Sequence, residues 1–193
     1  KKADFILFGR RGRYEGMSHR GFLILEVEPP GGASPFILVG THLQAIAAVD
    51  DWDAVGAQRA QILQLKALLA GYTKHWKLPV MVLGDLNLAP TAYRDHYLML
   101  LGELGLTDAF AFLHPGAEGF TYCSCNPIAA ASPFADGGSA RIDHALLRSG
   151  RAGAAWRPLE AEVVFKELYP SPDGNIPVSD HYAMRVKTEY FSN

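Results

Sequence analysis

The amino-acid sequence predicts a single α/β domain over residues 1–193, in which strands form a layered sandwich with helices packed against it. Short apolar runs of strand length recur through the chain, and two intervening stretches carry apolar residues at helical spacing. Strands and helices do not alternate regularly, so a layered sandwich is favoured over a βαβ repeat. With 193 residues, 49% of them hydrophobic, the chain can bury one sizeable core, and no linker or internal repeat divides it.

The first part of the chain predicts mostly β-structure. "DFILFGR" at 4–10 and "GFLILEVE" at 21–28 are apolar runs of strand length, separated by a polar connection that contains glycine. "PFILVGTHL" at 35–43 is a further run of this kind and follows the turn-forming residues "PPGGAS". We therefore expect the start of the chain to be mostly β-structure.

Two helices are expected, one on each side of a buried strand in the sequence. Between Asp53 and Ala70, apolar residues recur at helical spacing, at Val55, Ile62, Leu65 and Leu69. Aspartates precede this stretch and Gly71 follows it, as is typical of helix ends. "LPVMVLGD" at 78–85 predicts a short buried strand, and "YRDHYLMLLGEL" at 93–104 predicts a second helix that ends near Gly105.

The second half of the chain predicts strands joined by two long loops. The expected strands are "FTYC" at 120–123, "RIDHALLR" at 141–148, "AEVVFKEL" at 161–168 and "HYAMRVKTEY" at 181–190. Proline and glycine are frequent in 127–138 and 170–177, so both segments are expected to be loops.

Charge and composition limit the classes of partner. The formal net charge of −2 provides no overall attraction for polyanions, so any phosphate recognition must be local. No apolar run approaches the length that spans a bilayer, so the sequence predicts a soluble chain. The sequence does not specify its compartment, and secretion and a peripheral position on a membrane are both open. Cys123 and Cys125 have no second pair, so they are expected to be structural or free thiols rather than a disulfide framework or a zinc site.

Polar residues at the ends of apolar strands are the main functional signal. His42 ends "ILVGTH", Asp85 and Asn87 end "VMVLGDLN", Asp143 opens "DHALL", and Asp180 and His181 precede the last strand. A buried charge in such a place is unfavourable by several kcal/mol unless a partner or a metal compensates it. Residues two apart leave an extended segment on the same side, so Asp85 and Asn87 are expected to address one ligand.

Each of these residues also has a purely structural interpretation. His42 alone is typical of a hydrogen-bonded structural histidine, Asp85 of a turn, and Asp143 of a surface ion pair. The sequence contains no phosphate-binding loop, dinucleotide fingerprint, zinc-protease motif or serine-nucleophile elbow. His144 is expected to face away from Asp143 and to be a packing or surface residue. Only the combination of the strand-end residues favours a shared site.

The ordered motifs "GTHLQA", "LGDLN", "RIDHALL" and "SDHYAM" resemble the endonuclease/exonuclease/phosphatase superfamily, which includes deoxyribonuclease I, apurinic endonucleases, inositol polyphosphate phosphatases and neutral sphingomyelinases. The resemblance covers nearly the whole chain and is strongest to the sphingomyelinase branch. "SHRGFLILEV", "GTHLQA", the helix around Arg59 and "FTYCSCNPIAA" before "ARIDH" are similar to that branch.

The resemblance implies a deoxyribonuclease I-like fold, a two-layer β-sandwich flanked by helices, with a site for Mg²⁺ or another divalent cation. In it, His181 would be the general base that takes a proton from water. Asp143 would hold the His181 imidazole in the required tautomer and stabilise its charged form. His42 would donate a hydrogen bond to a phosphoryl oxygen whose charge grows in the transition state.

Three further roles follow from the same resemblance. Asp180 would support the metal and the water, Asp85 would position the nucleophile or leaving group, and Asn87 would orient the phosphate. Members of this superfamily also carry an asparagine strand and a glutamate metal ligand ahead of the matched region. Glu15, Glu26 and Glu28 do not lie in that motif context, so the chain is expected to be N-terminally incomplete.

The substrate implied by the resemblance is sphingomyelin at a membrane surface, cleaved to phosphocholine and ceramide. Bacterial sphingomyelinases carry an aromatic hairpin ahead of "SDH", and Phe165, Leu168 and Tyr169 occupy that place, although a buried strand is an equal alternative. A Mg²⁺-dependent nuclease is a second candidate, with a basic cluster at Arg10, Arg11, Arg13 and Arg20 as its phosphate contact. A non-catalytic module on the same scaffold is a third.

Overall fold

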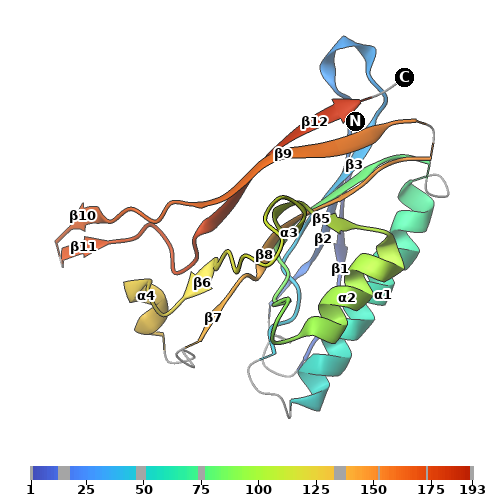
Figure 1. The fold of residues 1–193 in the computed structure, drawn as a ribbon. Coiled ribbons are helices and arrows are strands. Elements are labelled where there is room, and N and C mark those ends of the chain that lie inside the picture. Colours follow the sequence, from blue (N-terminus) through green and yellow to red (C-terminus); the bar gives the residue numbers. More distant parts are fainter. Residues whose placement is uncertain are drawn as a thin grey trace.

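The computed structural model describes residues 2–12, 18–46, 51–73, 77–132, 138–151, 153–172 and 174–191. Arg13 and Glu15 lie outside these ranges. The described part is organised around a six-stranded sheet of order β1-β2-β3-β4-β8-β5 (Figure 1). Its strands are β1 (Ala3–Leu7), β2 (Gly21–Val27), β3 (Phe36–Thr41), β4 (Val80–Asp85), β8 (Asp143–Arg148) and β5 (Thr107–Asp108). β3 and β4 run parallel, and the other neighbours are antiparallel.

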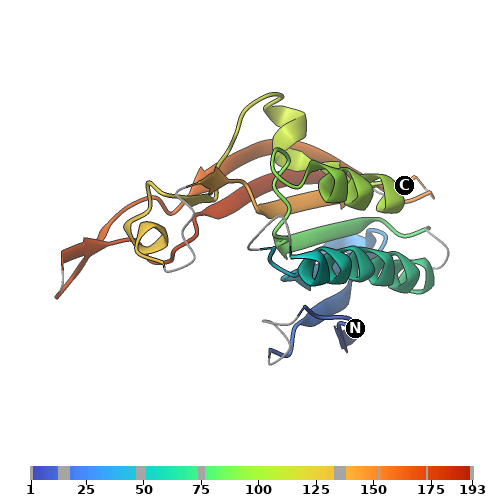
Figure 2. The same cartoon turned by 90° about the horizontal axis from the view of Figure 1, so that it is seen from below.

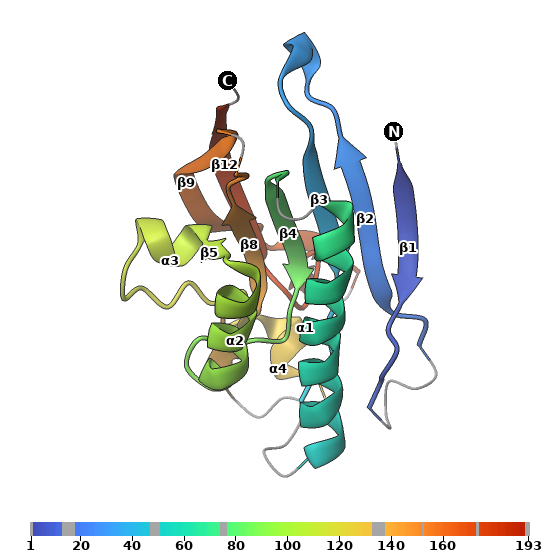
Figure 3. The same cartoon turned by 90° about the vertical axis from the view of Figure 1, so that its right-hand side faces the viewer.

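Two helices, α1 (Trp52–Tyr72) and α2 (Arg94–Leu104), cover one face of this sheet (Figure 3). Both predicted helices are confirmed. Asp51 caps the start of α1, where its side chain accepts a hydrogen bond from the amide of Ala54. Gly105 ends α2 in the left-handed conformation with φ 63°, which glycine adopts without steric cost.

The core lies between the helices and the sheet. Alternate residues of β2, β3 and β4 point to the helices. Four of these residues are at most 1% exposed, namely Phe22, Ile24, Val80 and Val82. Helix residues that meet them are equally buried, namely Ile62, Leu65, Leu69 and Leu100. Each such side chain contributes roughly 1.5–3 kcal/mol on burial. This packing makes the sheet a rigid support for the residues at the ends of its strands.

The second layer of the sandwich is formed, within the described residues, by β9 (Ala155–Val164) and β12 (Ala183–Phe191), which pair antiparallel. Phe36 leaves β3 on the face opposite the helices, and its ring lies 4.9 Å from that of Trp156 on β9 and 5.7 Å from that of Tyr190 on β12. In Figure 2 this pair, drawn in orange and red, lies next to β8. The predicted sandwich with flanking helices is therefore confirmed.

Three segments differ from the predicted elements. In the loop expected at 127–138, the first residues form a short helix, α4 (Pro127–Ala130), which Asn126 caps by accepting from the amides of Ile128 and Ala129. The strand expected at 161–168 begins earlier, at Ala155, and ends at Val164. Its first half contains charged residues, which hide the apolar pattern of a strand in the sequence. These charged residues pair with β12 across the sheet, as Glu160 does with Lys187 at 2.9 Å. The loop expected at 170–177 contains a hairpin of β10 (Tyr169–Ser171) and β11 (Gly174–Ile176) that projects from the body (Figure 1).

Short elements complete the fold. A 3₁₀ turn, η2, spans Pro30–Gly32, and the remaining elements are α3 (Ala109–Leu113), β6 (Tyr122–Cys123), α4 (Pro127–Ala130) and β7 (Ser139–Ala140). No helix among the described residues is long and apolar enough to cross a membrane.

The two cysteines correct an expectation. Cys123 and Cys125, expected as structural or free thiols, are joined in a disulfide, with their Cα atoms 5.1 Å apart. The turn at Ser124 brings them together, and the amide of Cys125 donates to the sulfur of Cys123 at 2.9 Å. A Cα separation in this range is what a disulfide requires. The sequence spacing alone does not reveal such a turn.

Candidate active site

Sheet topology brings three of the predicted motifs to one edge. β3 and β4 run parallel, so His42, which follows β3, and Asp85 and Asn87, at and just after the end of β4, emerge at the same end. β8 runs antiparallel to β4 and begins at Asp143, which is the register partner of Asp85. His181 joins the same edge through an isolated bridge between its backbone and that of Tyr122.

His42 and Asp85 form the first pair of the site. Nε2 of His42 lies 3.2 Å from Oδ2 of Asp85. Gly84 makes this approach possible, since its φ is 139° and a Cβ there would lie 1.9 Å from the carbonyl oxygen of Thr41. The glycine in "LGD" therefore lets the ends of β3 and β4 come close enough for their polar residues to meet.

Asn87 is placed differently from the expectation. The segment from Asp85 to Asn87 is not extended, because Asn87 has a left-handed φ of 49° and its amide donates to Oδ1 of Asp85 at 2.9 Å. Such a turn is a conformation that asparagine tolerates better than most residues. The side-chain amide of Asn87 donates to the carbonyl of Leu43 at 3.0 Å, which ties the β4 end to the His42 loop. Its predicted contact with phosphate stays a prediction.

Asp143 and His181 form the second pair. Nδ1 of His181 lies 2.8 Å from Oδ2 of Asp143. Thr121 holds both residues in place, because its hydroxyl accepts from the amide of Asp143 at 3.1 Å and its carbonyl accepts from the amide of Tyr182 at 2.7 Å. The ring of Tyr122 lies 5.3 Å from the His181 ring. The side chains of Asp143 and His181 are about three quarters buried but reach solvent.

The electrostatic environment separates the protonation states of the two histidines. Burial lowers the pKa of His42 to about 4, and the nearby charge of Arg20 acts in the same direction. The hydrogen bond to Asp143 raises the pKa of His181. His42 is therefore neutral at neutral pH, whereas His181 is set to gain a proton. This difference suits a hydrogen-bond donor on one side and a proton acceptor on the other.

Asp85 is the most perturbed carboxyl group at this edge. Burial raises its pKa to about 6, and the charge of Asp143 adds to the shift. Two carboxylates held in register on neighbouring strands repel one another. A divalent cation between them would remove that repulsion.

Asp85 and Asp143 fit such a cation, and His181 lies beside them. Each offers one ligand atom, and these atoms lie within 4.8 Å of one another; the described ranges contain no other group of three that meets this criterion. Carboxylate oxygens are the ligands that hard divalent cations prefer. Asp180, the predicted metal residue, is exposed and its Oδ1 accepts from the hydroxyl of Ser179 at 3.3 Å. It is not part of this group, and its metal role stays a prediction.

The raised pKa of Asp85 leads to a pH-dependent stability. An acid whose pKa is higher in the folded state than its usual value of about 3.9 destabilises the fold as pH rises through both values. We expect Asp85→Asn, measured by urea unfolding in a chelator, to raise the free energy of unfolding by ~1–3 kcal/mol above pH 7. Near pH 4 the gain should vanish. An equal change at both pH values, or the same profile in the exposed control Asp53→Asn, would contradict the strain assigned to Asp85.

A buried polar network behind the site escaped sequence reasoning. Asp108, at the end of β5, accepts from Arg141 at 2.5 Å, from the Tyr97 hydroxyl at 2.9 Å and from the amide of Ala111 at 3.0 Å. Nδ1 of His144 lies 3.0 Å from the same carboxylate, and its Nε2 donates to the carbonyl of Leu88 at 2.8 Å. The packing role expected for His144 is confirmed. One feature of the sequence could have pointed to Asp108, because aspartate is a preferred residue at the start of a helix and Asp108 caps α3.

No family profile and no curated protein matches the sequence. Solved structures do match its fold. Sphingomyelinase C from Streptomyces griseocarneus superposes with a TM-score of 0.68 at 21% identity, over 96% of this chain and 63% of its own. Truncated Caenorhabditis elegans TDP2 gives 0.67 at 19%, over 100% and 66%, and the human Nocturnin catalytic domain with bound sulfate gives 0.65 at 18%, over 99% and 59%.

These likenesses establish the fold. It is a deoxyribonuclease I-like fold, as the sequence motifs implied, and a sphingomyelinase is among the solved structures that share it. The chain spans 59–66% of the length of the three structures named above.

Proposed function

We propose that this chain carries the catalytic histidine–aspartate pair of a divalent-metal-dependent phosphodiesterase, and that the substrate is sphingomyelin, cleaved to phosphocholine and ceramide. The observation that carries the proposal is the convergence of His42, Asp85, Asp143 and His181 at one edge of the sheet. Structural likeness to a sphingomyelinase supports the same reaction class.

His181 is the proposed general base. Its Nδ1–H donates to Asp143, which leaves Nε2 free of a proton and able to accept one from the attacking water. The charge that then develops on the imidazole is stabilised by the Asp143 carboxylate, in keeping with the raised pKa of His181. No covalent intermediate is required, because water attacks the phosphorus directly.

His42 and the acidic pair serve the phosphoryl group. A neutral His42 donates one N–H, and we expect a phosphoryl oxygen to accept it at Nε2, the atom that lies 3.2 Å from Asp85, when substrate enters. Mg²⁺, bound by Asp85 and Asp143, would neutralise charge on the phosphoryl oxygens. Asn87 holds the Asp85 loop against the loop that follows His42, so the two halves of the site move together.

The β10–β11 hairpin favours a lipid substrate over nucleic acid. Around it, Phe165, Leu168, Tyr169, Ile176 and Val178 are each at least 40% exposed, and the hairpin leads into the segment that carries His181. Aromatic and aliphatic side chains on a projecting hairpin suit the interface of a bilayer. In the basic cluster, by contrast, Arg10 is paired with Asp53 at 3.4 Å, and Arg11 donates to the carbonyl of Ser18 at 2.9 Å.

Substrate preference tests the proposal directly. Sphingomyelin vesicles and, in a separate reaction, single-stranded or plasmid DNA are incubated with the protein and Mg²⁺. Release of phosphocholine that a chelator prevents is the expected result. Cleavage of DNA alone would overturn the lipid assignment, and no Mg²⁺-dependent hydrolysis of either substrate would favour a non-catalytic module.

The hairpin has its own test. Phe165→Ala combined with Leu168→Ala is expected to lower the rate on sphingomyelin vesicles by about ten-fold or more, because each lost side chain removes roughly 1.5–3 kcal/mol of apolar burial. Hydrolysis of soluble bis(4-nitrophenyl) phosphate should be unchanged. Phe112→Ala is the matched control, since Phe112 is 62% exposed elsewhere on the surface. An equal loss on both substrates would show that the hairpin acts on the site and not on the membrane.

A further inference from the structure

The Cys123–Cys125 disulfide lies beside the loop that carries the proposed base. Cys123 belongs to β6 and is buried, whereas Cys125 follows the turn and is exposed. The sulfur of Cys125 lies 3.9 Å from the hydroxyl of Tyr182, the residue after His181. Because a disulfide sulfur has no hydrogen, the Tyr182 hydroxyl is the donor in this contact.

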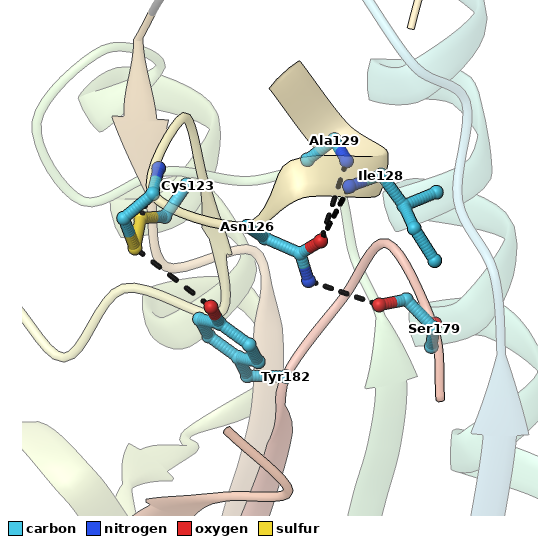
Figure 4. The surroundings of a disulfide bond; sticks show 7 residues. Cys123, Asn126, Ile128, Ala129, Ser179 and Tyr182 are labelled. Carbon is cyan, nitrogen blue, oxygen red and sulfur yellow. Dashed lines mark hydrogen bonds between the residues drawn. A yellow bond between two sulfur atoms is a disulfide. The ribbon is translucent and has the colours of Figure 1, made fainter. Parts of the chain in front are cut away.

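Asn126 extends the connection to the other side of the His181 loop. It is fully buried, and its side-chain amide donates to the carbonyl of Ser179 at 2.9 Å. Its Oδ1 accepts from the amides of Ile128 at 3.0 Å and Ala129 at 3.4 Å, which begins α4. Figure 4 shows Asn126 between the short helix and the Ser179 backbone. The residue directly after Cys125 is therefore one support of the loop.

The residues directly before Cys123 support the same loop and its partner strand. Thr121 accepts from the amides of Asp143 and Tyr182, and the Tyr122 ring faces that of His181. The segment from Thr121 to Asn126 thus contacts both members of the proposed pair, and the disulfide fixes the backbone at its centre. A change in the spacing of the two cysteines is transmitted to Asp143 and His181 without passing through any other element.

Stability of the fold does not explain this disulfide. The stabilisation from a disulfide grows with the length of the loop that it closes, and here the cysteines are only two positions apart. The exposed Cys125 is open to attack by a thiolate, which is the condition for exchange. The pair therefore has the placement of a reactive site rather than of a structural staple.

We propose that Cys123 and Cys125 form a thiol–disulfide exchange site whose redox state sets the position of the Ser179–His181 loop. The effect of this site on turnover rests on the proposed function. The structural coupling between the disulfide and the loop does not depend on that function.

The co-reactants are two molecules of a low-molecular-weight thiol. The first thiolate attacks Cys125, the bond between the cysteines breaks, and the Cys123 thiolate leaves and takes up a proton. The second thiolate attacks the bound thiol, releases the Cys125 thiolate, which is protonated, and forms the small disulfide. The protein gains two electrons, and the two thiols lose them.

The disulfide form is the one that holds the loop in the arrangement described above. Reduction releases the turn between Cys123 and Asn126, so Asn126 and Tyr182 lose their fixed distance from β6. Displacement of a general base by about 1 Å is enough for a large rate loss, and we expect kcat to fall about ten-fold or more on reduction.

The test compares oxidised and reduced protein in two readouts. The protein is equilibrated with glutathione disulfide or with a phosphine reductant, and mass spectrometry of peptides establishes the state of Cys123 and Cys125. Backbone amide NMR shifts of Asp143 and residues 179–182 report the coupling without any need for turnover. Hydrolysis of bis(4-nitrophenyl) phosphate with Mg²⁺ reports its effect on activity. Cys125→Ser, at the exposed position, and Cys123→Ala each prevent the bond, so one misfolded variant does not end the experiment.

The expected result is a shift of the Asp143 and 179–182 amides on reduction of the wild type, matched by both variants in either reagent. Amides that do not move when the disulfide is reduced would overturn the proposal, as would cysteines that stay reduced or pair only between molecules in glutathione disulfide. If the amide signals shift on reduction but the protein has no phosphodiesterase activity, the structural coupling stands and the proposed function is refuted. An active enzyme with equal kcat in both states would refute regulation.

Discussion

Replacing His181 with alanine is expected to lower kcat on a phosphodiester by about 10²–10⁴-fold, the usual contribution of a positioned general base. His181 is the residue whose Nδ1 contacts Asp143 at 2.8 Å and whose Nε2 is left to accept a proton. Its side chain is 25% exposed and reaches solvent, so water can fill the space that its removal leaves and the fold should persist. The measurement is hydrolysis of bis(4-nitrophenyl) phosphate under saturating Mg²⁺, with circular dichroism as the check on folding.

A matched control distinguishes loss of the general base from the effect of removing any histidine. His19→Ala removes an exposed histidine away from the pair and should leave kcat unchanged. Asp143→Asn should also lower kcat, because it removes both the carboxylate that orients the His181 ring and a proposed ligand of Mg²⁺. A His181→Ala variant with activity near that of the wild type would remove His181 from the proposed role.

Replacing Asp108 with asparagine is expected to lower the free energy of unfolding by about 3–5 kcal/mol, because breaking a buried ion pair leaves a charge uncompensated. Arg141 is 4% exposed and would keep its charge without the carboxylate that it contacts. Tyr97 and His144 would exchange a charged acceptor for a neutral amide. Urea unfolding followed by circular dichroism measures the effect, with Asp95→Asn on the exposed face of α2 as the control.

The same network has a defined pH dependence. Burial opposes ionisation of Asp108, but the hydrogen bonds and charges of His144 and Arg141 outweigh it and hold the pKa of Asp108 below its usual range. A carboxyl group with a lowered pKa stabilises the fold above its unfolded pKa of about 3.9, and that stability is lost as pH falls below it. The difference between wild type and Asp108→Asn should therefore be full near neutral pH and shrink in acid. A difference below about 1 kcal/mol at neutral pH would show that Arg141 finds another partner.

The polar residues at strand ends could be predicted from the sequence alone, because finding them does not require the order of the strands in the sheet. An aspartate, an asparagine or a histidine directly after an apolar run is unfavourable there without a partner. That logic led to His42, Asp85 and Asp143 and to their shared edge, which the register of β4 with β8 brings about. The extended geometry expected for Asn87 was wrong, since its left-handed φ depends on a local turn that the letters "DLN" do not specify.

Other features depend on contacts between distant segments and left little trace in the sequence. Arg141 and Asp108 are separated by 33 positions and read singly as surface charges, yet they meet in the interior. The β10–β11 hairpin lies in a segment rich in proline and glycine, which predicts a loop but not which loops pair their backbones. The disulfide likewise depends on the turn at Ser124 rather than on the number of cysteines.

Binding of a paramagnetic cation tests the central arrangement most directly. Mn²⁺ is titrated into isotopically labelled protein at substoichiometric ratios, and broadening of backbone amide signals maps the residues around the ion. We predict that the signals of Asp85, Asn87, Asp143 and His181 broaden first, and that Asp85→Ala combined with Asp143→Ala abolishes the effect. Broadening centred on other residues, or broadening that the double variant does not change, would contradict a metal-dependent site at this edge of the sheet.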